Sequence, residues 1–218
     1  LAPEGPSAES IQQLVIPVTA IAGIVFVLVI GAILFITWKF RERQDSDPDE
    51  FPSQIHGKTT LEIGWTILPA LILAGIAVGT VMTIINLNRE EPNAIKVQVA
   101  GQQWWWEYKY DLNGDGNFDG PEDITTATEL VIPAGKPVQV TTTSNDVIHS
   151  FWIPGLNGKK DAVPGLYNPL KLQADEPGVF RGQCTEFCGL SHANMRMLVR
   201  AVSSSDYDAW VRNQLKDH

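Results

Sequence analysis

Four side chains that can bind a metal lie within twelve residues near the C-terminal end of the sequence. They are Cys184, Cys188, His192 and Met195. A disulfide would explain the two cysteines but gives the histidine and the methionine no role. Structural zinc would use both cysteines, His192 and one further histidine, but not the methionine. Thiolate, imidazole and thioether together suit copper, and copper sites of this kind transfer electrons.

Two cysteine thiolates can bridge two copper ions, and a binuclear centre of this kind needs a second histidine from another strand. The sequence has four histidines. His149, in the segment NDVIHSFWIPG, is the obvious candidate, because His56 follows the first apolar segment and His218 is the last residue. The residues alone therefore favour a binuclear copper site and leave the disulfide and the zinc site as alternatives.

Two long apolar segments precede this region, and residues 11–38 and 63–88 contain no charged side chain. About 20 apolar residues are enough for a helix to cross a bilayer, so we expect transmembrane helices at about 11–39 and 61–88. Pro17 and Pro69 are no objection, since membrane helices tolerate proline. We predict an N-terminal segment and transmembrane hairpin over residues 1–92, and an extracytoplasmic domain over residues 93–218.

The distribution of basic residues predicts the orientation of this hairpin. Residues 1–38 contain no lysine or arginine, whereas the link between the apolar segments contains four, namely Lys39, Arg41, Arg43 and Lys58. The positive-inside rule then places the link in the cytoplasm. Both termini and the metal-binding domain are expected on the outer, periplasmic face of a bacterial plasma membrane. Because the sequence starts at Leu1, we also expect that a signal peptide has been removed.

The region after Ala94 consists of short strand patterns separated by Gly/Pro turns, which is typical of an all-β sandwich or barrel. A short closing helix is predicted from about Asp206 to Lys216, with Ser204 or Ser205 as its N-cap. The formal net charge of −9 lies mostly outside the apolar segments. This charge argues against nucleic acid as a partner and favours a basic protein.

One loop, DLNGDGNFDGPE at residues 111–122, fits the pattern of an EF-hand calcium loop. Gly116 stands at the position of the sharp turn. The expected oxygen ligands come from Asp111, Asn113, Asp115, Asn117, Asp119 and Glu122. The alternative is an Asn/Asp/Gly hairpin turn with an acidic face. Calcium is therefore one of two interpretations of this loop.

Several segments of the sequence together resemble subunit II of the haem–copper cytochrome c oxidases. They are TLEIGWTILPA, GQQWWWEYKY, NDVIHSFWIPG, KKDAVPG and GQCTEFCGLSHANM. The resemblance runs from the second apolar segment almost to the C-terminus, and the two-helix anchor matches as well. It implies a cupredoxin-like β-sandwich on a helical hairpin, with a binuclear CuA centre. The implied ligands are the side chains of His149, Cys184, Cys188, His192 and Met195, and the backbone carbonyl of Glu186.

The resemblance also implies roles for four further groups and several partners. Trp104, the first tryptophan of WWW, would receive electrons from cytochrome c, and the chain would pass them to haem in subunit I, where oxygen is reduced and protons are pumped. Glu62 would lie at the mouth of a proton channel. The Glu186 side chain and Asp161 would help to bind magnesium or manganese at the subunit I interface. Subunit III and membrane lipid are the other expected partners.

The sequence departs from the usual family pattern at two positions. Trp105 stands where tyrosine is common, and Lys109 replaces a common acidic residue, which removes one negative charge from the expected docking face. Asp146 and the acidic loop after Tyr110 are candidates to supply that charge. The sequence contains no CxxCH motif, so a fused cytochrome c domain is not expected within it.

Three other functions remain as alternatives. A quinol oxidase subunit II has the same fold but lacks the copper ligands. A CuA-containing subunit of a nitric oxide reductase is excluded less firmly. A membrane-anchored copper carrier, or a calcium-stabilised scaffold without electron transfer, belongs to a different class.

Overall fold

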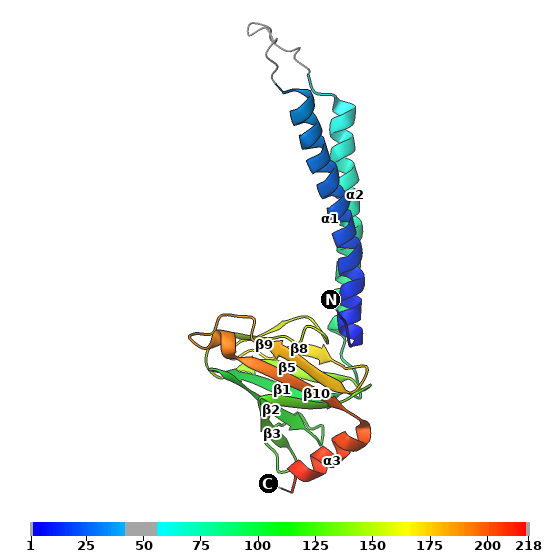
Figure 1. Ribbon diagram of the computed structural model, residues 1–218. Coiled ribbons are helices and arrows are strands. Elements are labelled where there is room, and N and C mark those ends of the chain that lie inside the picture. Colours follow the sequence, from blue (N-terminus) through cyan, green and yellow to red (C-terminus); the bar gives the residue numbers. More distant parts are fainter. Residues whose placement is uncertain (1, 42–55, 217–218) are drawn as a thin grey trace. The chain divides into compact units, whose positions relative to one another are not determined.

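The computed structural model describes residues 2–41 and 56–216 (Figure 1). Leu1, Arg43 and His218, which bear on the predictions above, lie outside the described residues. The chain divides into two compact units. One unit comprises Leu1–Gln12 with Thr83–His218, and the other comprises Gln13–Met82.

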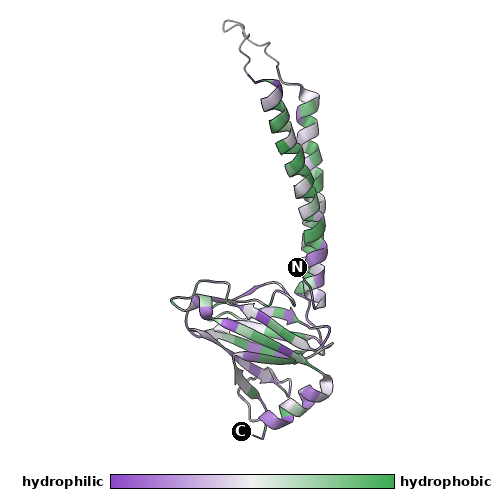
Figure 2. Cartoon of the chain, in the orientation of Figure 1, coloured by the Kyte–Doolittle hydropathy of each residue, from purple (hydrophilic) through white to green (hydrophobic). Residues whose placement is uncertain are grey.

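The two N-terminal helices are α1 (Pro6–Lys39) and α2 (Thr59–Leu87). Both are long and apolar enough to cross a membrane, and Figure 2 shows mostly hydrophobic residues along the middle of both helices. A helix that is apolar on every side needs an apolar surrounding. Helix α1 begins at Pro6, before the apolar segment, because proline at the first helical position costs no hydrogen bond.

Ten strands form the second part of the chain. The five-stranded sheet has the order β3-β2-β1-β5-β8, the three-stranded sheet has the order β4-β10-β9, and β6 pairs with β7. The strands are β1 (Ile95–Gln102), β2 (Trp105–Asp111), β3 (Ile124–Ala127), β4 (Glu129–Pro133), β5 (Val138–Ser144), β6 (His149–Phe151), β7 (Lys160–Ala162), β8 (Asn168–Leu172), β9 (Gly178–Gln183) and β10 (Arg196–Val202).

The buried faces of the two larger sheets share one hydrophobic core. Side chains alternate along β2, where Trp106, Tyr108 and Tyr110 are fully buried. From the opposite sheet, Leu130 and Val199 contribute to the same core. The predicted fold, two apolar helices followed by a β-sandwich and a short C-terminal helix, is confirmed.

The closing helix is α3 (Ser204–Gln214). Its N-cap is Ser203, so the prediction of Ser204 or Ser205 was wrong by one or two residues. Ser203 has extended backbone angles, with φ −59° and ψ 155°, and its hydroxyl accepts a hydrogen bond from the Asp206 amide at 3.2 Å. On the inner side of the helix, the Trp210 ring lies 5.1 Å from the ring of Tyr110.

Candidate metal centre

The loop that contains both cysteines connects two neighbouring strands. Strands β9 and β10 are antiparallel, and Gln183 at the end of the first pairs with Arg196 at the start of the second. The Cys184 amide donates to the Met195 carbonyl at 2.9 Å, which extends this pairing by one step. The two ends of the loop are therefore held together, and all twelve residues fold over the end of the sheet. A short 3₁₀ helix, η1 (His192–Asn194), closes the loop.

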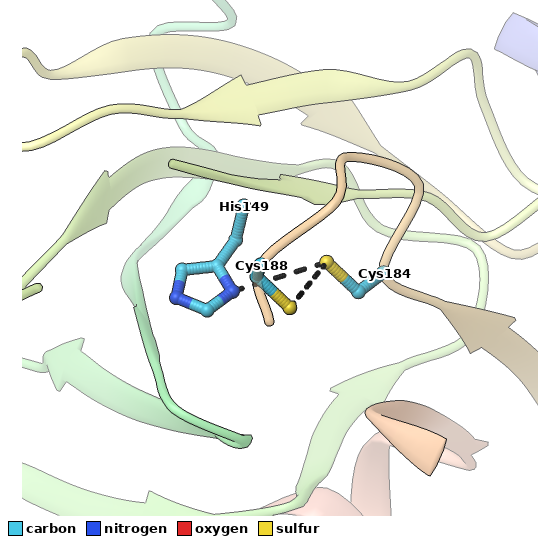
Figure 3. A group of neighbouring side chains, drawn as sticks. All are labelled: His149, Cys184 and Cys188. Carbon is cyan, nitrogen blue, oxygen red and sulfur yellow. Dashed lines mark hydrogen bonds between the residues drawn. The ribbon is translucent and has the colours of Figure 1, made fainter. Parts of the chain in front are cut away.

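Each predicted ligand has at least one other within 4 Å. The two cysteine sulfurs are 3.8 Å apart, and His149 Nδ1 lies 3.9 Å from the sulfur of Cys184. On the other side, the Cys188 sulfur lies 3.5 Å from His192 Nδ1 and 3.7 Å from Met195 Sδ. Figure 3 shows the His149 ring and the two sulfurs turned toward one another. Strand β6 and the β9–β10 loop thus bring distant parts of the sequence to one site.

The donor set fits copper better than the two alternatives. Both cysteines are free, and a sulfur separation of 3.8 Å is far from the roughly 2.05 Å of a disulfide bond. Zinc sites take four donors in a tetrahedron, but here Met195 Sδ and the Glu186 carbonyl, 3.3 Å from the sulfur of Cys184, also face the cysteines. Thiols, imidazoles and a thioether around one point are the ligands that copper takes for electron transfer.

Burial and mutual contact give the two thiols different acidities. Burial, the largest single influence, opposes ionisation of Cys184, but hydrogen bonds with His149, His192 and the backbone of Ser150 and Glu186 together outweigh it and lower the pKa to about 6. For Cys188, burial and the neighbouring sulfur charge both act in the same direction and raise the pKa to about 12. One thiolate is therefore formed readily in the metal-free site. A second thiolate needs a positive charge beside it, and a bound cation provides one.

His149 is held on three sides. Its Nε2 lies 2.8 Å from Asp146 Oδ1, which directs Nδ1 toward Cys184. The Trp106 ring stands edge-on to the imidazole, with 5.8 Å between ring centroids. A Cβ atom on Gly101 would lie 2.7 Å from His149 Cδ2, so only glycine allows this close approach. From the sequence, Asp146 was expected only as a docking charge, although its three-residue spacing from His149 was a usable signal.

The tryptophans of WWW have different environments. Trp104 and Trp105 are 37% and 38% exposed, whereas Trp106 is fully buried. The Trp104 indole N–H donates to the Cys188 carbonyl at 3.1 Å. An exposed aromatic ring is thus hydrogen-bonded to the backbone of a predicted ligand.

Comparison with known proteins identifies the family of this chain. Residues 95–202 match the description "Cytochrome C oxidase subunit II, periplasmic domain", and residues 3–83 match "Cytochrome C oxidase subunit II, transmembrane domain". Cytochrome c oxidase subunit 2 of Arabidopsis thaliana is 35% identical over 210 residues, which cover 88% of this chain and 79% of that protein. The chain belongs to the cytochrome c oxidase subunit II family.

Bacterial members of the family are similar over nearly the whole chain. Subunit 2 of Cereibacter sphaeroides is 34% identical over 94% of this chain and 76% of its own length. Subunit 2 of Alkalihalophilus pseudofirmus is 37% identical over 97% of this chain, which spans 60% of that longer relative. The crystal structure of the periplasmic domain of subunit II of Bradyrhizobium japonicum cytochrome oxidase covers 58% of this chain and 97% of that domain, with 32% identity and a TM-score of 0.52. The similarity to these relatives confirms the predicted family. Together with the two apolar helices, it shows that the chain is a membrane protein.

The two carboxylates of the predicted magnesium or manganese site lie near a lysine. Asp161 accepts hydrogen bonds from Lys159 and from Ser150, each at 2.8 Å, and these bonds lower its pKa. The pKa of Lys159 is raised, first by Asp161 and also by the charge of Glu186. The Lys159 ammonium group therefore contacts the Asp161 carboxylate and interacts with the charge of Glu186. Magnesium or manganese binding by Glu186 and Asp161 stays a prediction.

In the EF-hand-like loop, the side-chain oxygens accept hydrogen bonds from the loop's own backbone. Asp111 accepts from the amides of Gly114 and Gly116, at 2.6 and 2.9 Å. Lys109 contacts Asp119 at 2.5 Å. Within residues 2–41 and 56–216, the group of His, Cys, Asp and Glu side chains whose ligand atoms lie close enough to hold a metal ion is that of His149 and the two cysteines, not this loop. These contacts fit a hairpin turn, and calcium binding stays a prediction.

Calcium binding by this loop would raise the thermal stability of the chain. Calcium at 100 times its dissociation constant would add about 2.7 kcal/mol to the free energy of unfolding. The rise in Tm should be absent in Glu122→Gln, which lacks the carboxylate at the last loop position. An unchanged Tm of the parent chain in millimolar calcium would contradict the calcium interpretation and leave the hairpin turn.

Proposed function

We propose that this chain receives electrons for a cytochrome c oxidase through a binuclear copper centre held by the Cys184–Met195 loop and His149. The observation that supports this most strongly is the convergence of two free thiols, two imidazoles and a thioether. A copper pair bound here would supply reversible one-electron chemistry. The ligands would be His149, Cys184, Cys188, His192 and Met195 by side chain, and Glu186 by its carbonyl.

The protein's own contribution is rigidity and the exclusion of water. His149, Cys184, Cys188 and Met195 are at most 4% exposed. They are fixed by the β9–β10 pairing and by Asp146, so little reorganisation accompanies a change of charge. Trp104 offers an exposed ring next to this buried site, and we assign the acceptance of electrons from cytochrome c to it.

The remaining partners follow from the family. We propose that electrons pass on to haem in subunit I, where oxygen is reduced and protons are pumped, and that subunit III belongs to the same complex. The domain over residues 93–218 would face the periplasm of a bacterial cell. Copper content, near-infrared absorption and the EPR signal of a mixed-valence copper pair test the site. Co-purification with a haem-bearing subunit tests the complex and separates it from a nitric oxide reductase or a copper carrier.

Replacing Trp104 by phenylalanine tests the assignment of electron acceptance. Phenylalanine keeps an aromatic ring but lacks the N–H that donates to the Cys188 carbonyl. We expect kcat/KM for cytochrome c to fall by about tenfold or more, equivalent to ~1.4 kcal/mol, with unchanged copper spectra. Trp105→Phe, at an equally exposed position, is the matched control. Equal kinetics of both variants would exclude Trp104 as the acceptor.

Glu62 lies in the first turn of α2, and we propose that it feeds protons to the complex. A carboxylate at a membrane boundary can relay protons, but an amide cannot. We expect Glu62→Gln to slow the reductive, proton-coupled steps roughly tenfold, as measured by anaerobic stopped-flow reduction of the oxidised complex and by turnover kinetics. The CuA spectra should stay as in the parent. Glu90→Gln, beyond the other end of α2, is the control and should turn over normally.

A further inference from the structure

Gln103 connects two parts of the candidate metal centre, Asp146 and the cysteine loop. Its backbone N–H donates to Asp146 Oδ2 at 2.6 Å. Its side-chain amide donates to the Cys188 carbonyl at 2.8 Å, and the Trp104 indole donates to the same carbonyl at 3.1 Å. A carbonyl oxygen has two lone pairs, so both acceptor sites of this carbonyl are in use.

Through Asp146, Gln103 is also connected to His149, the predicted ligand outside the cysteine loop. Asp146 uses one carboxylate oxygen for Gln103 and the other for His149 Nε2. Gln103 therefore joins the cysteine loop, 85 residues away in the sequence, to the carboxylate that orients His149. Trp104 contacts the same cysteine carbonyl, but its indole provides no such link to Asp146.

Close packing fixes the place of the glutamine amide. Gly189 follows Cys188 with φ +117°, a region that disfavours side chains. A Cβ atom on Gly189 would lie 3.0 Å from Gln103 Nε2 and 3.3 Å from Trp104 Cζ2. The peptide after Cys188 thus lies directly against both donors, and the loop has no free space on this side.

From these contacts we propose that Gln103 is a positioning residue that fixes Cys188 and, through Asp146, His149. It holds the cysteine loop against the β1–β2 turn before any metal is bound. The identity of the metal rests on the proposed function, whereas the positioning of Cys188 does not. Loss of the side-chain amide leaves the Cys188 carbonyl with the Trp104 indole as its remaining side-chain donor.

Alkylation of the metal-free full-length chain in detergent tests this role directly. Cys188 is 3% exposed, so iodoacetamide reaches it when the loop opens. We expect Gln103→Leu to raise the alkylation rate of Cys188 roughly 3- to 10-fold, the effect of one net hydrogen bond on an opening equilibrium. Gln98→Leu removes an amide on the preceding strand β1, outside this network; it is the control and should react at the parental rate.

Copper competition provides the second readout. With copper supplied against a chelator, we expect Gln103→Leu to bind about 10- to 100-fold more weakly than the parent, as is typical when the partner of a metal ligand is removed. Gln103→Asn keeps the backbone bond to Asp146 but is one methylene too short to reach the carbonyl. Cys188 in Gln103→Asn should therefore be alkylated faster than in the parent. This variant still tests the proposal if Gln103→Leu fails to fold.

Parental alkylation and parental copper affinity in Gln103→Asn would overturn the proposal. A parent chain that binds no copper would overturn the proposed function instead, and the alkylation of metal-free protein would still decide the role of Gln103. Faster alkylation in both Gln103→Leu and Gln98→Leu would also count against it, because it would indicate a general loosening of β1.

Discussion

Replacing Cys188 by serine is expected to abolish the binuclear copper centre and leave the fold intact. The Cys188 sulfur lies within 4 Å of the sulfurs of Cys184 and Met195 and of His192 Nδ1. A serine hydroxyl is similar in size but is a poor ligand for copper, which prefers soft sulfur donors. The near-infrared band and the mixed-valence EPR signal should disappear. Electron uptake from cytochrome c should fall by at least about a hundredfold, or ~2.7 kcal/mol.

A matched control lies on the same loop. Leu190 is 99% exposed, so Leu190→Ser makes a change to serine without touching the site, and its copper spectra should equal those of the parent. Met195→Leu removes a weaker ligand and should shift the spectra without removing the copper pair. A Cys188→Ser variant that retains the two-copper EPR signal would refute the assignment of Cys188 as a bridging ligand.

Much of the candidate site could be predicted because its chemistry is local in the sequence. Four of the proposed ligand side chains fall within one loop, and His149 was selected as the fifth by elimination among four histidines. The length of the two uncharged apolar segments likewise predicted the helices, and the alternation of apolar and polar residues predicted the strands. Neither inference needed knowledge of which segments meet in space.

The supporting contacts could not be predicted, because they join residues far apart in the chain. Gln103 and Cys188 are 85 positions apart, and no pattern in the sequence pairs them. The interaction of Lys159 with the charge of Glu186 likewise joins residues far apart in the sequence, whereas Asp161 is only two residues from Lys159. The prediction of the N-cap of α3 failed for a different reason. Three consecutive serines offer equivalent hydroxyls, and only the backbone angles decide which of them caps the helix.

Replacing Trp106 by alanine is expected to cause a large loss of stability. The indole is fully buried, and its ring lies 5.5 Å from Phe151 and 5.8 Å from His149. Truncation of a buried tryptophan to alanine costs about 3–5 kcal/mol, because the cavity fills only partly. For a chain of this size the Tm of the full-length protein in detergent should fall by roughly 6–20 °C. Near-UV circular dichroism during thermal unfolding measures the shift.

Trp106→Phe separates packing from hydrogen bonding at this position. In the described structure the buried Trp106 Nε1 has no hydrogen-bond partner, so the change to phenylalanine removes no hydrogen bond. Trp106→Phe should therefore lose less than half as much stability as Trp106→Ala. The same ring also limits the movement of His149. Copper affinity should therefore follow the same order, with Trp106→Phe close to the parent and Trp106→Ala weakest. An alanine variant with parental Tm and parental copper affinity would show that neither the core nor the His149 ring depends on this indole.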